Sequence, residues 1–258
     1  MLSINNSVER YGNIMNYEVV SLFDRYDLFK RQDEVCGDVW PEFMRHDPVA
    51  NTNWMKFINT FKDLQLLLMY EEEILAVINT VPIYFEKNIN DLPDNGWDWG
   101  VKKAMTDYEE GISPNTLMGV QIVVNRLHQG KGLSTIAIKE LRQLATTRNF
   151  QKIIIPVRPS NKHQYPLIPM ENYIEWKDAN GFPYDNWLRV HIKNGGKIIK
   201  VCPNSMYIPG TIEDWKKWTS LDFLESGKYV VPGALNPISI DKEGNIGEYI
   251  EPNVWILH

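Results

Sequence analysis

The chain has 258 residues, of which 43% are hydrophobic and 23% charged, the ordinary balance of a globular protein that buries a core. Its formal net charge of −6 argues against a general nucleic-acid binder, and no apolar run reaches the length of a membrane span or forms a signal peptide. Cys36 and Cys202 stand in no metal-ligand spacing, so we expect no metal, and two such cysteines are typical of a cytoplasmic protein. From the charge and the lack of a membrane span we expect neither a nucleic acid nor a membrane as partner.

The N-terminal third predicts helices followed by a hairpin. Helical patterns occur around 17–31 and 48–63, with a helical turn begun by Pro41 between them. The runs 64–70 and 74–81 are apolar and partly β-branched. Since a short acidic stretch joins them, they predict two antiparallel strands.

The next segment predicts a βαβ unit. Residues 116–124 are almost continuously apolar, as in a strand buried on both faces. Apolar side chains recur at helical spacing from about 132 to 148, and 152–157 is again a buried strand. Residues 129–134, here called the glycine loop, join the first strand to the helix. The crossover between the two parallel strands should be right-handed.

The remainder of the chain predicts shorter elements. A long irregular segment at 159–184 carries prolines and aromatic residues, and a helix at 186–194 and a strand at 197–203 follow it. Thr211 begins a short helix through a capping-box pattern. The tail holds short strands with a hairpin turn at residues 242–245. We expect one mixed α/β domain.

The glycine loop matches neither of two common phosphate-binding motifs. No glycine lies five residues before Gly130, and a third glycine with GxGxxG spacing is missing. A plain turn between strand and helix remains open. The residues Gln129, Gly130, Lys131, Gly132, Leu133 and Ser134 resemble the Q/R-x-x-G-x-G/A signature of the GNAT superfamily of acyl-CoA-dependent N-acyltransferases, with Ser134 where glycine or alanine is usual.

The order of elements over roughly residues 60–200 is also similar to that of the family. The resemblance implies an α/β (α+β) GNAT-type fold, with a central, mixed, mostly antiparallel sheet flanked by helices. We expect a single domain with its core at about 60–205, N-terminal helices in 1–63 and a C-terminal extension at 206–258. The insertion at 159–184 is either a lid, a wall of the acceptor site or a packed surface loop.

Acetyl-CoA or another acyl-CoA is the co-substrate that the resemblance implies. Its pyrophosphate would meet the unpaired N–H groups at the start of the helix, where glycines allow a close approach of the backbone. Lys131 adds a positive charge and Ser134 a hydroxyl donor. Val123 and Val124 would pair through their backbone with the pantetheine arm, and one N–H of this strand would face the thioester carbonyl.

The resemblance also implies direct attack of an amine on the thioester, without a covalent enzyme intermediate. An acid must then protonate the leaving thiolate. His191 stands at the place of a tyrosine that often serves as this acid in the family, and Tyr184 is the alternative. A structural role for His191 also remains open.

Four polar residues are candidates for the acceptor side of the site: Glu42, His46 and Asn125 for binding the amine, and Gln121 for catalysis. Gln121 and Asn125 share a strand face with Val123, and Gln121 either acts at the acceptor or is a satisfied buried amide. Glu42 and His46 lie four residues apart on one helical face, and they either recognise the amine or belong to the surface.

These observations favour an enzyme that moves an acetyl or longer acyl group from acyl-CoA to an amine of a small-molecule or peptide acceptor. The alternative is a non-catalytic acyl-CoA-binding module of the same fold, and a nucleotide-binding protein is a weaker third reading. A small-molecule amine is the expected partner, and a homodimer is an open option. The tryptophan pairs at 96–100 and 213–218 either build core or line a pocket.

Overall fold

The computed structural model describes residues 6–10 and 13–258. These residues form a ten-stranded sheet in the order β1-β2-β3-β4-β5-β6-β10-β9-β8, and β7 pairs with β10 off this path. The strands are β1 (Asn6–Arg10), β2 (Asn13–Ser21), β3 (Leu66–Tyr70), β4 (Glu73–Ile83), β5 (Thr116–Val124), β6 (Lys152–Val157), β7 (Lys197–Gly210), β8 (Gly227–Tyr229), β9 (Ile238–Asp241) and β10 (Ile246–Leu257).

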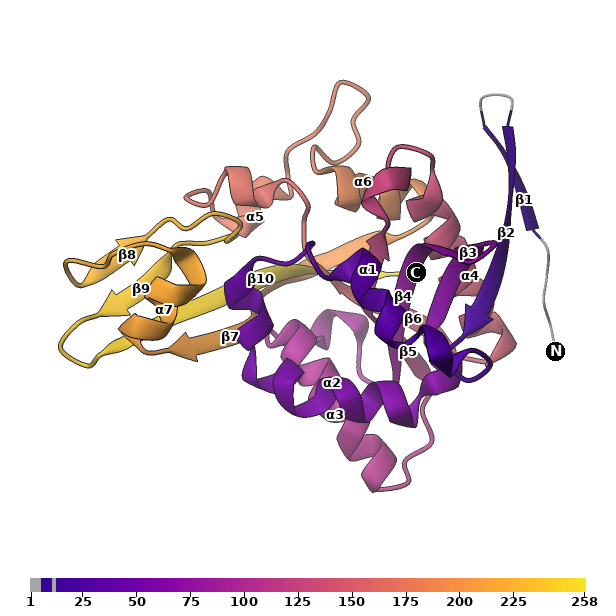
Figure 1. Ribbon diagram of the computed structural model, residues 1–258, viewed down its shortest axis with the longest axis horizontal. Helices are drawn as coiled ribbons and strands as arrows, with labels where there is room; N and C mark the ends of the chain where they lie inside the picture. The colour runs from indigo at the N-terminus through magenta and orange to yellow at the C-terminus, as the bar shows by residue number, and fades with distance from the viewer. Residues whose placement is uncertain (1–5, 11–12) are drawn as a thin grey trace.

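Helices cover both faces of this sheet. In Figure 1, α2 and α3 pack together on one side, and α4 and α6 lie on the other. α7 lies over the arm formed by the ends of β7 and β10. The helices are α1 (Asp33–Cys36), α2 (Pro48–Thr60), α3 (Gly96–Glu109), α4 (Leu133–Thr147), α5 (Met170–Tyr173), α6 (Asn186–Lys193) and α7 (Ile212–Thr219).

The predicted central elements are confirmed. β3 and β4 form the antiparallel hairpin, and β5 and β6 are parallel strands joined through α4. Thr211 begins α7 with a capping box, in which its hydroxyl accepts from the backbone N–H of Asp214. The predicted helix around 48–63 is α2, whose first turn is capped by Asp47.

The helix predicted around 17–31 is wrong. Its first residues belong to β2, and only short 3₁₀ turns at Tyr26–Leu28 and Lys30–Gln32 precede the four-residue α1. β2 pairs antiparallel with β3, so that Val20 lies opposite Leu67. The β-branched residues Val19 and Val20 suit a strand, and the neighbouring strand satisfies their backbone groups.

The boundary of the core near residue 205 is also corrected. β10 lies between β6 and β7 and is antiparallel to both, with Val254 opposite Val157 on one side and Val201 on the other. Tyr249, Val254, Trp255 and Ile256 are fully buried. The segment 206–258 therefore supplies an inner strand of the sheet, in addition to the hairpin strands β8 and β9.

Two irregularities in β5 shape the middle of the sheet. β5 pairs with β6 only from Thr116 to Met118, although it runs on to Val124. A β-bulge leaves Val120 without a partner on β4, because Asn79 pairs with Gln121 and the next residue pairs with Gly119. Beyond Met118 the two strands diverge, and this opening is called the β5–β6 gap below.

Candidate active site

A 3₁₀ turn at Arg126–His128 leads from the end of β5 to the glycine loop. Asn125 caps this turn, because its side-chain oxygen accepts from the N–H of Leu127 at 3.0 Å, and its side-chain nitrogen donates to the carbonyl of Ile74 at 3.0 Å. Both groups of Asn125 are therefore used to hold the loop on β4. Its predicted contact with the acceptor stays a prediction.

The two glycines of the loop have left-handed backbones. Gly130 has a φ of 79° and Gly132 a φ of 80°, which other residues rarely adopt. A Cβ placed on Gly130 would meet no atom within 4 Å, so the surface above it is open. Gly132 caps α4, whose first residues are Leu133, buried in the core, and Ser134. The first N–H groups of this helix lack partners within it and suit an anion.

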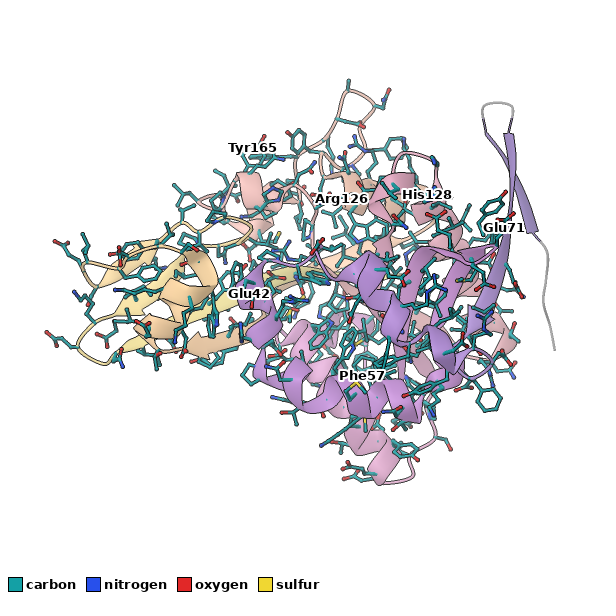
Figure 2. The ribbon with its side chains drawn as sticks, in the orientation of Figure 1. Glu42, Phe57, Glu71, Arg126, His128 and Tyr165 are labelled. Atoms are coloured by element: carbon teal, nitrogen blue, oxygen red, sulfur yellow. The ribbon has the colours of Figure 1, made fainter. Side chains whose placement is uncertain are left out.

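Positive charge lies beside this helix start. Nζ of Lys131 is 3.0 Å from Nδ1 of His128, and Nε2 of His128 is 2.7 Å from Oε1 of Glu73 in the hairpin. Figure 2 shows Arg126 and His128 at the same end of the molecule as the turn between β3 and β4. The exposed Gln129 and Lys131 complete the loop.

A surface hollow of about 330 Å³ continues from the first turn of α4 along the helix. Thr135, Lys139 and Arg142 are among its lining residues. Arg142 also donates to the carbonyl of Asn194 at the end of α6, at 2.7 Å. Lys139 and Arg142 thus bring two positive charges to this hollow, farther along α4 from the loop.

Gln121 belongs to a buried chain of amides. Its Oε1 accepts from the indole N–H of Trp40 at 3.0 Å, and its Nε2 donates to Oδ1 of Asn79 at 3.0 Å. Asn79 in turn donates to Oε1 of Gln65, at 3.2 Å. Cys36 lies 3.3 Å from Gln121, and burial raises the pKa of its thiol to about 12. This chain fixes Trp40 over β5 and satisfies the amide of Gln121.

His191 lies inside the fold on α6. It is fully buried, and its Nδ1 is 2.8 Å from Nε2 of His258. Burial, and then the neighbouring His258, hold the pKa of His191 well below its usual value. The imidazole is therefore neutral at pH 7, and its assignment as the acid stays an untested prediction.

Tyr184 is half-buried, immediately before α6. Its hydroxyl is 2.9 Å from the hydroxyl of Tyr165, and its ring packs edge-on against Trp176. The insertion that holds these rings is packed and not loose. The buried amine of Lys162 donates to the carbonyls of Tyr165, at 2.9 Å, and Leu235, at 2.6 Å.

Glu42 and His46 share a helical turn, with Nε2 of His46 3.2 Å from Oε1 of Glu42. The ring of His46 stacks on Trp218 of α7, with 4.2 Å between ring centroids. Figure 2 shows Glu42 well apart from His128 and the glycine loop. The structure thus places Glu42 and His46 in a different region from the predicted donor-binding loop, whereas Asn125 lies beside that loop.

The contacts that Trp40 and Trp97 make with β5 were not identified from the sequence. Trp40 contacts Gln121, and the indole N–H of Trp97 donates to the carbonyl of Val120 at 3.0 Å. The tryptophan pair at 96–100 was a visible signal. Only the β-bulge, which a sequence pattern does not reveal, explains why a tryptophan is needed there.

Comparison with known proteins defines the class. Residues 25–168 match the model of the Acetyltransferase (GNAT) family. The chain is 32% identical to an arginine N-acetyltransferase, avaD, of Aspergillus versicolor, over 91% of this chain and 90% of that protein. The chain therefore belongs to the GNAT family and is an enzyme that transfers an acyl group from acyl-CoA to an amine.

Solved structures show the same fold. The loading GNATL domain of CurA from Lyngbya majuscula matches with a TM-score of 0.56 at 18% identity, over 94% of this chain and 96% of that one. The GphF GNAT-like decarboxylase in complex with isobutyryl-CoA matches with a TM-score of 0.54 at 12% identity, over 94% and 97%. None of the helices in the described residues combines the length and hydropathy that a membrane span requires.

Proposed function

We propose that the protein transfers an acetyl group from acetyl-CoA to the amino group of arginine or of a closely similar cationic amine. The observation that carries this proposal is the 32% identity to an arginine N-acetyltransferase, which extends over nine-tenths of both chains. The match extends over segments on both the donor and the acceptor side of the candidate site, which supports a common acceptor.

The donor side fits an acyl-CoA. The helix start at Leu133 and Ser134 offers backbone N–H groups to the pyrophosphate, and Lys131 adds a charge at its rim. The edge of β5 beyond Met118 has no strand partner among the described residues, so its peptide groups are available to a pantetheine arm. This edge includes Val123 and Val124.

The acceptor side fits a cation. Asp33 on α1, Asp38 and Glu42 are exposed, and Trp40, which precedes Glu42 in the chain, donates to Gln121 on β5. Neither Asp33 nor Asp38 has an ion-pair partner among the described residues. Exposed carboxylates without ion-pair partners make the electrostatic potential near Trp40 more negative, which favours a positively charged acceptor over an anionic one.

Only the neutral amine can attack the thioester carbonyl. An alkyl amine with a pKa near 10 is neutral in about one molecule per thousand at pH 7. When the C–S bond breaks, the thiolate takes a proton. As the acid that gives this proton, Tyr184 is a better candidate than His191, because Tyr184 is half-buried whereas His191 is fully buried.

The test joins binding to turnover. Calorimetry with CoA and acetyl-CoA should show binding that Gly132→Glu abolishes, since a carboxylate at the helix start repels the pyrophosphate. Gly111→Glu is the matched control, because Gly111 also has a positive φ (67°) and open space around it, but lies at the end of α3. The variant thus reproduces the backbone strain and the charge outside the loop.

Turnover is measured with arginine, agmatine, lysine and Nα-acetylarginine as acceptors. Transfer to arginine but not to Nα-acetylarginine supports the proposal and places the reaction on the α-amino group. Binding of acetyl-CoA without transfer to any amine would instead support the non-catalytic module.

A further inference from the structure

The β5–β6 gap has a defined inner end. A Cβ on Gly119 would lie 3.0 Å from Cγ1 of Ile155, so β5 and β6 are still in close contact at this point. The gap widens from Val120 onward, where the β-bulge lies. From Val124, at the end of β5, to Val120 is four residues, or about 13 Å at ~3.3 Å per residue. A pantetheine arm extended along this edge would run toward Val120.

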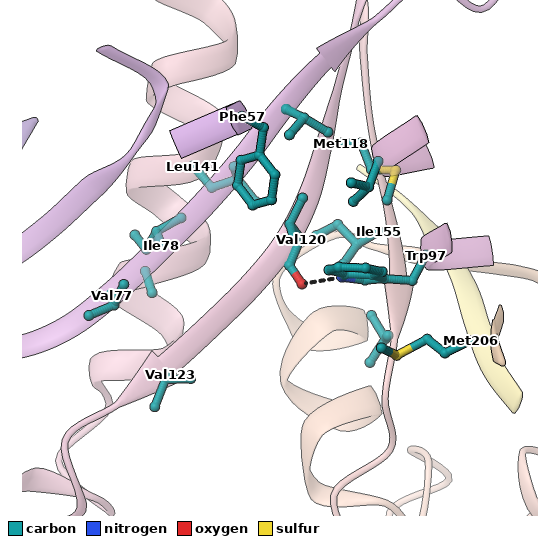
Figure 3. Close-up of a cluster of buried hydrophobic side chains, with 14 of the residues drawn as sticks. Phe57, Val77, Ile78, Trp97, Met118, Val120, Val123, Leu141, Ile155 and Met206 are labelled. Atoms are coloured by element: carbon teal, nitrogen blue, oxygen red, sulfur yellow. Dashed lines mark hydrogen bonds between the residues drawn. The ribbon is translucent and has the colours of Figure 1, made fainter. Parts of the chain in front are cut away.

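Trp97 fills this inner end. Figure 3 shows its indole between Val120 of β5, Ile155 of β6 and Met206 of β7, with the hydrogen bond from the indole N–H to the carbonyl of Val120. Trp97 is only 7% exposed, and its three neighbours are equally buried. Val120 has no partner residue on β4, and its carbonyl accepts from Trp97.

A hydrogen bond from the backbone of Trp97 holds this residue in position. Its N–H donates to Oγ of Ser205 at 2.9 Å, and Ser205 donates to Oδ1 of Asn253 on β10 at 2.6 Å. A Cβ on the preceding Gly96 would lie 2.2 Å from Oγ of Ser205, so only glycine allows this close approach. The first turn of α3 is thereby attached to β7 and β10, and the indole cannot leave the gap by a local rotation of the helix.

We propose that Trp97 closes the inner end of the acyl channel and restricts the donor to short acyl groups such as acetyl. This inference rests on the proposed function, in which the pantetheine arm lies along the edge of β5 beyond Met118, and it takes the thioester to lie beside Val120. A longer acyl chain would have to extend past Val120 into the space that the indole occupies. It would displace a buried aromatic ring and leave the buried carbonyl of Val120 without a donor, which is costly.

The experiment compares kcat/KM for acetyl-CoA, butyryl-CoA and hexanoyl-CoA with one saturating amine acceptor. The variants are Trp97→Ala, Trp97→Leu and Trp97→Phe. Trp99→Leu is the matched control, because Trp99 is two residues along the same helix but packs on Phe85 and Trp255. The ratio of the butyryl to the acetyl value is the readout, since a general loss of stability lowers both values together.

We expect Trp97→Ala and Trp97→Leu to raise this ratio by about tenfold or more, the scale on which a pocket discriminates added methylenes. Trp97→Phe should have a smaller effect, and Trp99→Leu none. Calorimetry should show that Trp97→Ala gains affinity for butyryl-CoA relative to acetyl-CoA. If Trp97→Ala does not fold, the leucine and phenylalanine variants carry the comparison.

Two results would overturn the role of Trp97: a wild-type enzyme that uses hexanoyl-CoA as well as acetyl-CoA, or folded variants with an unchanged ratio. Either result leaves the acyltransferase itself intact. A wild-type protein that binds acyl-CoA but transfers no acyl group to any amine would contradict the proposed function, and the shift in relative acyl-CoA affinity would then be the remaining test of Trp97.

Discussion

His191 on α6 and His258, the residue after β10, are joined inside the fold by a contact of 2.8 Å between Nδ1 and Nε2. The other ring nitrogens, Nε2 of His191 and Nδ1 of His258, are buried without a hydrogen-bond partner among the described residues. Burial lowers the pKa of both rings, that of His258 to about 4. The pair therefore fits a neutral structural link between a helix and the sheet.

The first prediction concerns acid stability. Between about pH 4 and 6.5 these histidines are protonated in the unfolded chain but neutral in the folded one. The free energy of unfolding therefore falls as the pH falls through this range. His258→Gln removes one of these groups and keeps a hydrogen-bonding side chain. We expect its melting temperature to depend less on pH between 7 and 4.5 than that of the wild type. His163→Gln, at an exposed position, should leave the slope unchanged.

The second prediction concerns a buried pair of carboxyl groups, Asp47 and Asp98. Each has one oxygen in use, since Asp47 caps α2 through the N–H of Ala50 at 2.7 Å and Asp98 accepts from the N–H of Tyr207 at 3.3 Å. Each also has one buried oxygen without a donor. Burial, and then the charge of Asp47, raises the pKa of Asp98 to about 8, while Lys102 opposes this shift. We expect the two carboxyl groups to share one proton, which would give a partner to both buried oxygens.

For this pair the dependence on pH has the opposite sign. The folded chain holds a proton that the unfolded chain loses near pH 4, so the free energy of unfolding falls as the pH rises from about 4 to about 8. In Asp98→Asn the amide N–H replaces the shared proton. The variant should gain stability relative to the wild type as the pH rises to 8, measured by urea unfolding at several pH values. A constant difference, like that expected for the exposed Asp91→Asn, would contradict the shared proton.

The third prediction tests Tyr184 as the acid. Tyr184→Phe should lower kcat by about a hundredfold or more, the range of general acid catalysis, with unchanged affinity for acetyl-CoA. Tyr165→Phe is the matched control, because it removes the partner of the same 2.9 Å hydroxyl contact but keeps the hydroxyl of Tyr184. Equal effects of the two variants would show that only the aromatic cluster matters.

The fourth prediction concerns Lys131 at the rim of the glycine loop. Lys131→Ala should weaken the binding of CoA by about twofold to fivefold, since an exposed charge pair contributes ~0.2–1 kcal/mol. The loss should shrink at high salt, which screens the charge. Acetyl-pantetheine lacks the pyrophosphate and should bind both proteins alike. A loss of the same size for acetyl-pantetheine would mean that Lys131 acts on the shape of the loop.

The middle of the fold could be predicted because its signals are local. The strands at 116–124 and 152–157 are almost continuously apolar, and α4 has a continuous buried stripe that includes Ile136, Leu141 and Leu144. The strand at Asn13–Ser21 was not predicted, because its apolar residues also fit a helical spacing, and only pairing with β3 decides between the two. The helix α3 was not predicted either, because it begins with Gly96 and contains Gly100, and glycines weaken a helical pattern.

In the candidate site too, the features that could be predicted are local in sequence, and those that could not depend on distant residues. The glycine loop is continuous in sequence, and its positive φ angles follow from its glycines. Burial of His191 depends on His258, 67 residues away, and the setting of Gln121 depends on Trp40, 81 residues away. A local pattern names such residue types but does not report which distant side chain they meet.

The central position of β10 has a consequence for how the chain folds during synthesis. Until residues 246–257 are available, the facing edges of β6 and β7 have no strand between them, and the buried Trp255 and Ile256 are missing from the core. Contacts between residues this far apart in sequence make folding slow, because long loops must close first. A nascent chain that ends before residue 246 thus exposes two unpaired strand edges, and we expect it to depend on chaperones until the last inner strand has been inserted.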